Sequence, residues 1–141
     1  MDSKICDLPE NYVPSENEEF MNDLQREYFR RKLIRWRTAL EQENEDAIKY
    51  LQQKERSYND EADRASNETD LAYELRTKER ARKLILKITD ALQRISNGTY
   101  GYCEETGEPI SLKRLDARPI AILSIEAQER HEKQERVQKN N

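Results

Sequence analysis

Three acidic residues lie within four positions near the middle of the chain, at Asp60, Glu61 and Asp63. With Asp60 as N-cap and Asp63 in the first turn, these carboxylates would accept backbone N–H bonds and favour the start of a helix. At an exposed tip, the same carboxylates can act on a metal ion or on basic groups of a partner. Capping and function are compatible, and the sequence leaves both roles open.

One cysteine stands where a zinc ribbon would place the first of four thiolates. Residues 101–107 (GYCEETG) have the shape of a zinc knuckle, in which C-x-x-C supplies two thiolates and a second pair follows roughly 18 residues later. The four corresponding positions are Cys103, Thr106, Ser124 and Ala127. Because one thiolate cannot hold a structural zinc ion, we expect no metal at these positions.

A stretch of the second half predicts a basic helix face. It carries Arg76, Lys78, Arg80, Arg82, Lys83 and Lys87 against Glu74 and Glu79. Such a face can bind nucleic acid, a phosphorylated ligand or an acidic protein groove, or it can simply be solvated. The formal net charge of −4 argues against non-specific DNA binding.

Catalytic constellations are not found in this sequence. The only histidine, His131, lies in a polar C-terminal stretch, and neither a Ser-His-Asp nor a Cys-His set can be built around it. The chain has no P-loop and no Gly-rich dinucleotide turn. We therefore expect a protein that is not an enzyme. With two cysteines, no secretory signal and no apolar run long enough for a membrane span, the expected compartment is the cytoplasm.

The elements that position these residues are predicted to be long helices. Residues 15–97 contain neither glycine nor proline, which disfavours an all-β or doubly wound α/β fold. Two stretches have the apolar spacing of a coiled-coil seam. The first carries Phe29, Leu33, Trp36, Leu40, Ala47 and Tyr50, with Glu43 filling a gap. The second carries Ala81, Ile85, Ile88, Leu92 and Ile95, with Leu71 and Leu75 upstream in a different phase.

A turn is predicted at residues 57–63, because this stretch lacks an apolar seam residue and its Ser, Asn and Asp side chains compete with the helical backbone. Two arms of about 50 Å would then pack as an antiparallel coiled-coil hairpin, and we expect that hairpin to be monomeric. One unbroken helix of about 125 Å is the alternative, and it would leave both apolar stripes exposed unless the chain dimerised.

The sequence thus predicts a mostly α fold with four parts. They are an extended leader at residues 1–18, the hairpin at 19–97, a small zinc-ribbon-like region at 98–123 and a C-terminal helix at 124–141 with Ser124 as its N-cap. Within the ribbon-like region we expect a β-hairpin of Thr99–Cys103 and Pro109–Leu115, joined by a turn at Glu104–Glu108.

Several stretches carry a resemblance to a known family. They are Phe29-Arg30-Arg31-Lys32-Leu33 with Trp36, Asp63-Arg64-Ala65, Glu74-Leu75-Arg76, Arg82-Lys83-Leu84-Ile85, Gly101-Tyr102-Cys103-Glu104 and Arg114-Leu115-Asp116-Ala117-Arg118-Pro119. In their order and spacing they resemble the DksA/TraR family of bacterial RNA polymerase-binding transcription factors. The likeness covers nearly everything from about Glu19 to the C-terminal helix.

The resemblance implies a hairpin that enters the secondary channel of RNA polymerase and modulates initiation, for example at ribosomal RNA promoters, without reading DNA. In the family an Asp-x-x-Asp-x-Ala tip lies near the polymerase active site. The matching positions here are Asp60, Asp63 and Ala65.

The resemblance also implies an effector and a departure from the usual metal site. The stringent-response alarmone ppGpp binds between such factors and polymerase, and the family's contacts fall on Leu84, Lys87 and Arg118. A further basic contact falls on Gln128, whose lost cation would weaken phosphate binding. The usual four-cysteine finger is reduced to Cys103, so the chain looks like a member that works without zinc.

Two other functions share parts of this pattern. A Gre-type transcript-cleavage factor would also place tip acids in the channel, where they would hold a second metal ion. A coiled-coil adaptor with no polymerase role would use the same hairpin for another partner. The ribbon-like C-terminal region favours the DksA type over the Gre type, and the adaptor remains an alternative.

Overall fold

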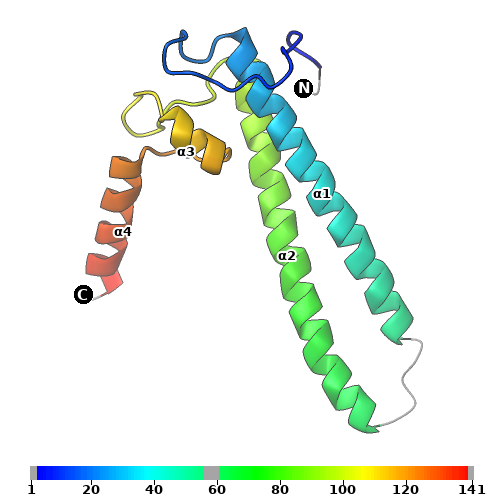
Figure 1. Ribbon diagram of the computed structural model, residues 1–141. Helices are drawn as coiled ribbons and strands as arrows, with labels where there is room; N and C mark the ends of the chain where they lie inside the picture. The colour runs from blue at the N-terminus through cyan, green and yellow to red at the C-terminus, as the bar shows by residue number, and fades with distance from the viewer. Residues whose placement is uncertain (1–2, 56–60, 140–141) are drawn as a thin grey trace. The chain divides into compact units, whose positions relative to one another are not determined.

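Four helices make up most of the described chain in the computed structural model. The structure describes the backbone of residues 3–55 and 61–139. The side chains of residues 54–67 are not described. The four helices are α1 (Asp23–Glu55), α2 (Glu61–Asn97), α3 (Leu112–Ala117) and α4 (Ile125–Lys139), shown in Figure 1. In these described residues no helix combines the length and the apolar character that crossing a membrane requires. The chain forms two compact units: Arg35–Thr89, here the distal unit, and Met1–Ile34 with Asp90–Asn141, here the proximal unit.

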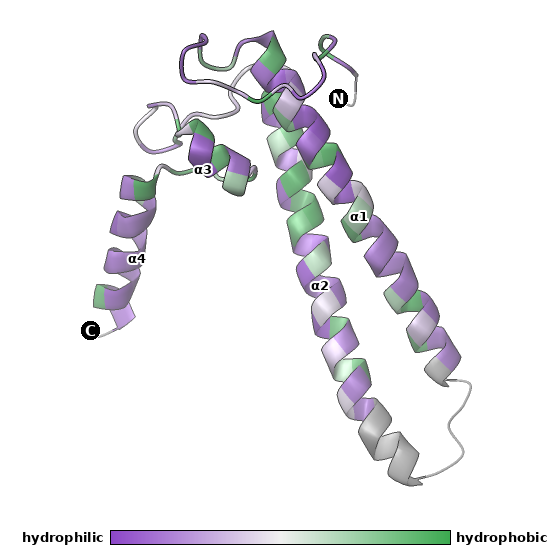
Figure 2. Cartoon of the chain, in the orientation of Figure 1, coloured by the Kyte–Doolittle hydropathy of each residue, from purple (hydrophilic) through white to green (hydrophobic). Residues whose placement is uncertain are grey.

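The distal unit consists of the outer parts of α1 and α2, which run antiparallel (Figure 1). The predicted helical hairpin is therefore confirmed, and the unbroken-helix alternative is wrong. Both arms are largely hydrophilic in Figure 2, as expected of two helices that share one narrow apolar seam. The residues around the predicted turn at 57–60 lie outside the described part of the chain.

The seam of the distal unit differs in phase from the predicted one. On α1, Leu40 is buried and Asn44, Ala47 and Leu51 are half-buried, whereas Glu43 is exposed. Tyr50, which the apolar pattern placed in the seam, is 40% exposed. The predicted seam was placed from the apolar residues alone, whereas the observed seam continues through the polar Asn44.

The α2 side of the seam runs without the predicted slip. Its least exposed positions keep a regular 3,4 spacing along the helix. They are Leu71, Glu74, Lys78, Ala81, Ile85 and Ile88. Leu75, which suggested the slip, is 55% exposed. The distal seam therefore contains Asn44, Glu74 and Lys78 where a strong coiled coil would have apolar residues.

The proximal unit holds the larger core. It buries Phe29, Leu33, Ala91, Leu92, Ile95, Tyr100, Cys103, Ile110, Leu115, Ile120, Ala121 and Ala127. The rings of Phe29 and Tyr100 pack with centroids 5.6 Å apart, and the Tyr100 hydroxyl donates to the Pro119 carbonyl at 2.8 Å. This core joins the bases of both long helices to the ribbon-like region.

The predicted β-hairpin is wrong, because neither Thr99–Cys103 nor Pro109–Leu115 forms a strand. The described residues contain one isolated antiparallel bridge, Tyr102–Pro109, and Leu112–Ala117 is the helix α3. Ser111 caps α3, because its side chain accepts the Arg114 backbone N–H at 3.2 Å. A proline on one side and a helix cap on the other thus confine the pairing to a single bridge.

The predicted N-cap of the C-terminal helix is confirmed. The Ser124 hydroxyl accepts the Ala127 backbone N–H at 3.2 Å, and the Ser124 carbonyl accepts the Gln128 N–H at 2.9 Å. Ala127 is fully buried, so α4 is attached to the ribbon-like region at its first turn.

Candidate functional site

The acidic tip lies at the start of α2. Asp60 is outside the described residues, and the helix begins at Glu61, directly after it. Asp63 and Ala65 belong to the first turns of α2, but their side chains are also outside the described part. Both roles of the tip carboxylates, capping and action on a partner, therefore stay predictions.

Four cations form a straight row on the exposed surface of α2, here the basic stripe. They are Arg76, Arg80, Lys83 and Lys87. Their 4,3,4 spacing places them on one face over about 16 Å of helix. None of them makes an ion pair with another residue that the structure describes. Like charges three or four residues apart cost the helix about 0.2–0.5 kcal/mol a pair, although the charge of Lys83 also attracts Glu79 on the same helix.

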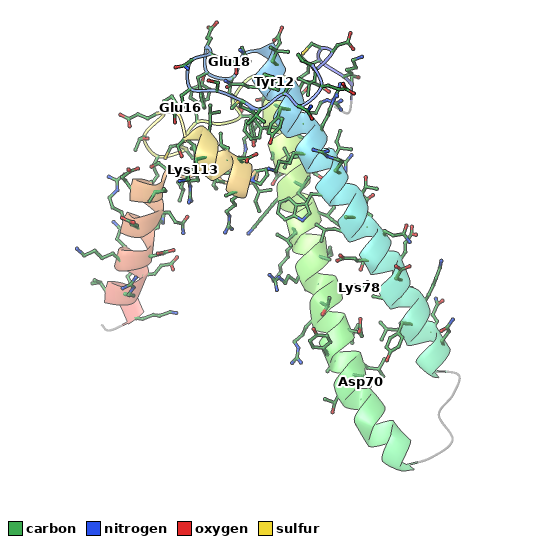
Figure 3. All side chains as sticks on the ribbon, in the orientation of Figure 1. Tyr12, Glu16, Glu18, Asp70, Lys78 and Lys113 are labelled. Atoms are coloured by element: carbon green, nitrogen blue, oxygen red, sulfur yellow. The ribbon has the colours of Figure 1, made fainter. Side chains whose placement is uncertain are left out.

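Two residues of the predicted basic face have other roles. Lys78, labelled in Figure 3, is half-buried in the seam. The Arg82 guanidinium donates to Glu79 at 2.7 and 3.0 Å. This pairing raises the pKa of Arg82 and lowers that of Glu79, as hydrogen bonding between opposite charges does. Burial separates Lys78 from the stripe, and the ion pair with Glu79 separates the exposed Arg82 from it.

The residues matched to the alarmone site fall in both units. Leu84 is half-buried and Lys87 exposed on α2 of the distal unit. Arg118 is exposed in the proximal unit, where its backbone N–H donates to the Arg114 carbonyl at 2.8 Å and closes α3. Gln128 is half-buried on α4 and donates to Glu132 at 3.3 Å. A joint site of these residues stays a prediction.

The four positions of the degenerate finger come together in the proximal unit. Cys103 is 2% exposed, and its sulfur accepts hydrogen bonds from the Thr106 hydroxyl and from backbone N–H groups of Ser124, Thr106 and Glu105. Burial alone would raise the pKa of the Cys103 thiol, but these hydrogen bonds favour the thiolate and lower the pKa to about 6. Ala127 is joined to the cluster through its N–H bond to Ser124.

The residues at these positions do not fit a structural zinc ion. Only Cys103 offers a thiolate, the Ser124 hydroxyl already accepts from Ala127, and an alanine side chain has no donor atom. Across the described residues, no group of three or more His, Cys, Asp and Glu side chains is arranged to hold a metal. Backbone N–H groups surround the sulfur instead of a cation.

His131 lies beside the knuckle and shows no catalytic arrangement. Its ring nitrogen Nε2 contacts the Glu105 carboxylate, and the Arg130 guanidinium lies 3.8 Å from the same group. Through these contacts with Glu105, two side chains of α4 interact with the knuckle loop. The His131 side chain is about half exposed.

One buried charge cluster was missed by the sequence reasoning. Glu27 is fully buried and accepts from Arg30 at 2.7 and 2.9 Å, from Arg31 at 2.6 Å and from the Ile5 backbone N–H at 2.9 Å. The Arg30 hydrogen bond contributes most to lowering the pKa of Glu27 to about 2. The spacing of Glu27 from Arg30 and Arg31 could have predicted these ion pairs. Nothing in the sequence indicates the contact with Ile5.

Comparisons with known proteins identify the family. The family model described as "DnaK suppressor protein DksA, N-terminal domain" matches residues 25–95, and the "Prokaryotic dksA/traR C4-type zinc finger" matches residues 98–133. A protein of Caulobacter vibrioides named RNA polymerase-binding transcription factor DksA is 56% identical over 130 residues, which cover 92% of each chain. The Escherichia coli protein of the same name is 39% identical over 83% of this chain and 78% of its own.

The solved structure of transcription factor DksA2 from Pseudomonas aeruginosa is also similar. It has a TM-score of 0.78 and 47% sequence identity, over 83% of this chain and 90% of that one. The resemblance stated from the motifs is thus confirmed by sequence and by fold. These matches show that the chain belongs to the DksA/TraR family.

Proposed function

We propose that this protein binds RNA polymerase by inserting its hairpin into the secondary channel and that it regulates initiation together with ppGpp. The observation that carries the proposal is the basic stripe on the outer face of the hairpin, in a chain whose relatives are named RNA polymerase-binding transcription factors. Four cations that make no ion pair within the described residues suit an acidic protein surface. The net charge of −4 disfavours a duplex as the partner.

In this proposal the tip supplies charge at the polymerase active site. Asp60 and Asp63, with Ala65 beside them, would lie near the catalytic Mg²⁺ and its basic surroundings. Carboxylates there shift the equilibrium between open-complex states only as far as they bind those states unequally. The chain itself catalyses nothing, does not read DNA, acts as a monomer and works in the bacterial cytoplasm beside its polymerase.

The effector site would combine Leu84 and Lys87 of α2 with Arg118 after α3. Lys87 and Arg118 are exposed cations, as contacts to an alarmone phosphate require. Gln128 offers an amide where relatives have a cation, so we propose a weaker dependence on ppGpp than a basic residue would give. The finger needs no zinc, because three of its four positions lack a thiolate.

In-vitro transcription from a ribosomal RNA promoter with the cognate polymerase, with and without ppGpp, tests the proposal. We expect the chain to inhibit, ppGpp to enhance the effect, and Asp63→Asn to weaken regulation while polymerase binding persists. Stimulated RNA cleavage in backtracked complexes would instead support a Gre-type role.

Docking is tested separately by charge reversal. Arg80→Glu with Lys83→Glu should weaken polymerase binding at least tenfold, since two attractive contacts become repulsive. Lys49→Glu, an exposed cation on the other arm, is the matched control. If both variants bind polymerase with equal affinity, the basic stripe is not the surface that docks on polymerase.

A further inference from the structure

The degenerate finger raises the question of what fixes its loop. In four-cysteine fingers the metal contributes folding energy directly, because the site does not exist in the unfolded chain. Here one thiolate remains, at Cys103. The loop from Gly101 to Ile110 has one β-bridge and hydrogen bonds of its own, and its Glu104 N–H donates to the Ile122 carbonyl at 2.9 Å. None of these contacts covers the loop backbone at Gly101, where packing has to come from another part of the chain.

Residues 3–22, here the strap, supply that packing. A Cβ atom at Gly101 would lie 3.2 Å from side-chain atoms of both Met21 and Phe20, so these two side chains rest directly on the loop backbone. The Phe20 ring meets the Tyr102 ring edge-on, with centroids 5.4 Å apart. The strap therefore packs against the knuckle at Gly101 and Tyr102, the two residues that precede Cys103.

The end of the strap is itself held by a buried side chain of α1. The fully buried Gln25 accepts the Met21 backbone N–H at 2.8 Å and donates to the Ser15 carbonyl at 3.3 Å. Met21 has a φ of 52°, a left-handed conformation that costs a non-glycine residue free energy. Such a conformation persists where surrounding contacts overdetermine it, as these do.

The middle and the start of the strap are also anchored. The Tyr12 hydroxyl donates to the Glu18 carboxylate at 2.9 Å, and Figure 3 labels both residues. Glu18 also accepts the Ser15 N–H at 2.9 Å. The Ile5 N–H donates to the buried Glu27 at 2.9 Å. A segment tied at both ends can press on a loop as a fixed surface rather than as a mobile tail.

We propose that the strap replaces zinc as the element that fixes the knuckle, with Phe20 and Met21 as its contact residues. The proposal rests on the zinc-free finger and is independent of any role at polymerase. It gives residues 3–22 the function of a built-in clamp that links α1 to the loop around Cys103.

Hydrogen exchange of the full-length chain, read by mass spectrometry, tests the clamp. In Phe20→Ala with Met21→Ala, amides of the 101–110 loop should exchange at least tenfold faster, including Cys103 N–H and Gly107 N–H, which bond to Glu108 and Cys103 carbonyls at 2.8 Å. The distal unit should exchange as before. Val13→Ala, at a strap position that is 67% exposed, is the matched control and should change neither.

A metal rescue separates clamping from general destabilisation. Thr106→Cys, Ser124→Cys and Ala127→Cys restore four thiolates, and zinc should then return slow loop exchange to the Phe20→Ala, Met21→Ala protein until a chelator is added. Each measurement is compared with the four-cysteine protein that keeps its strap. If the double variant fails to fold, Phe20→Leu alone provides a milder loss of contact and should give a smaller acceleration of the same amides.

Three outcomes would overturn the proposal. They are unchanged loop exchange in a folded strap variant, no rescue by zinc in a four-cysteine protein that binds the metal, and stoichiometric zinc in the natural chain by elemental analysis. A chain that fails to regulate transcription but shows the expected exchange pattern would contradict the polymerase role and leave the clamp supported.

Discussion

The Ile5 backbone N–H donates to the buried carboxylate of Glu27 at 2.9 Å, across 22 residues of sequence. The same carboxylate accepts from Arg30 and Arg31, so one side chain joins the strap to the first turns of α1. A buried carboxylate with this many donors is stabilised in its charged form, which explains its pKa of about 2.

Replacement of Glu27 by Gln should destabilise the chain by about 3 kcal/mol at neutral pH, because Arg30 stays buried after losing its charged partner. The folded pKa of about 2 lies below the ordinary 4.5, so this contribution is complete above pH 4.5 and is lost as pH falls through 2. Urea unfolding at pH 7 and pH 3 checks both parts. A difference between parent and variant that does not shrink at pH 3 would refute the assignment.

The stability of the knuckle should rise with pH because of Cys103. Its folded pKa is about 6 against an ordinary 9.0, so the contribution is complete above pH 9 and declines as pH falls towards 6. Cys103→Ser keeps a small polar side chain but cannot ionise in this range. From pH 6 to pH 9, the unfolding free energy of the parent should rise relative to that of the variant. If the two unfolding free energies change in parallel with pH, the buried sulfur is a neutral thiol.

Replacement of Asn44 by Leu should stabilise the hairpin by about 1–2 kcal/mol, since the buried Asn44 Oδ1 has no hydrogen-bond partner in the described structure. The melting temperature should rise, and exchange should slow in the described part of the distal unit. Glu43→Leu is the matched control, because Glu43 is exposed and Leu there gains no packing. An equal rise in both variants would place the seam elsewhere.

Gly101→Ala should cost more stability than Gly107→Ala. Both glycines have positive φ, +91° and +73°, so each alanine carries about 1 kcal/mol of backbone strain. Only at Gly101 does the new Cβ also meet Met21 and Phe20 at 3.2 Å, and displacing them adds roughly 1 kcal/mol or more. Urea midpoints of the two variants check the difference, and equal midpoints would mean that the strap yields without cost.

The long helices could be predicted because their signal is local. Residues 15–97 lack both helix breakers, and the apolar spacing around Phe29 and Ile88 fixes one face of each helix. The phase of the seam near Asn44 and Lys78 could not be predicted, because the seam positions there are polar and do not continue the apolar pattern. The α3 helix was missed because Ser111 and the hydrophobic residues after it suit a strand as well as a capped helix.

The candidate site was predictable where spacing alone defines it. The finger positions Cys103, Thr106, Ser124 and Ala127 were found from ligand spacing, and the structure brings them together. The contacts of Ile5 with Glu27 and of Phe20 with Gly101 join distant segments, and no short pattern encodes such contacts. The basic stripe emerged only when burial separated Lys78 from its neighbours.

Burial along α2 has a consequence for the order in which the hairpin forms and frays. Ile88, Leu92 and Ile95 are almost completely buried, whereas Glu74 and Lys78 occupy the seam further out. The free energy of local opening should therefore be lower around Glu74 and Lys78 than around Ile88 and Ile95. Folding is then expected to begin around the apolar Leu92 and Ile95 and to reach the polar seam positions Glu74 and Lys78 later.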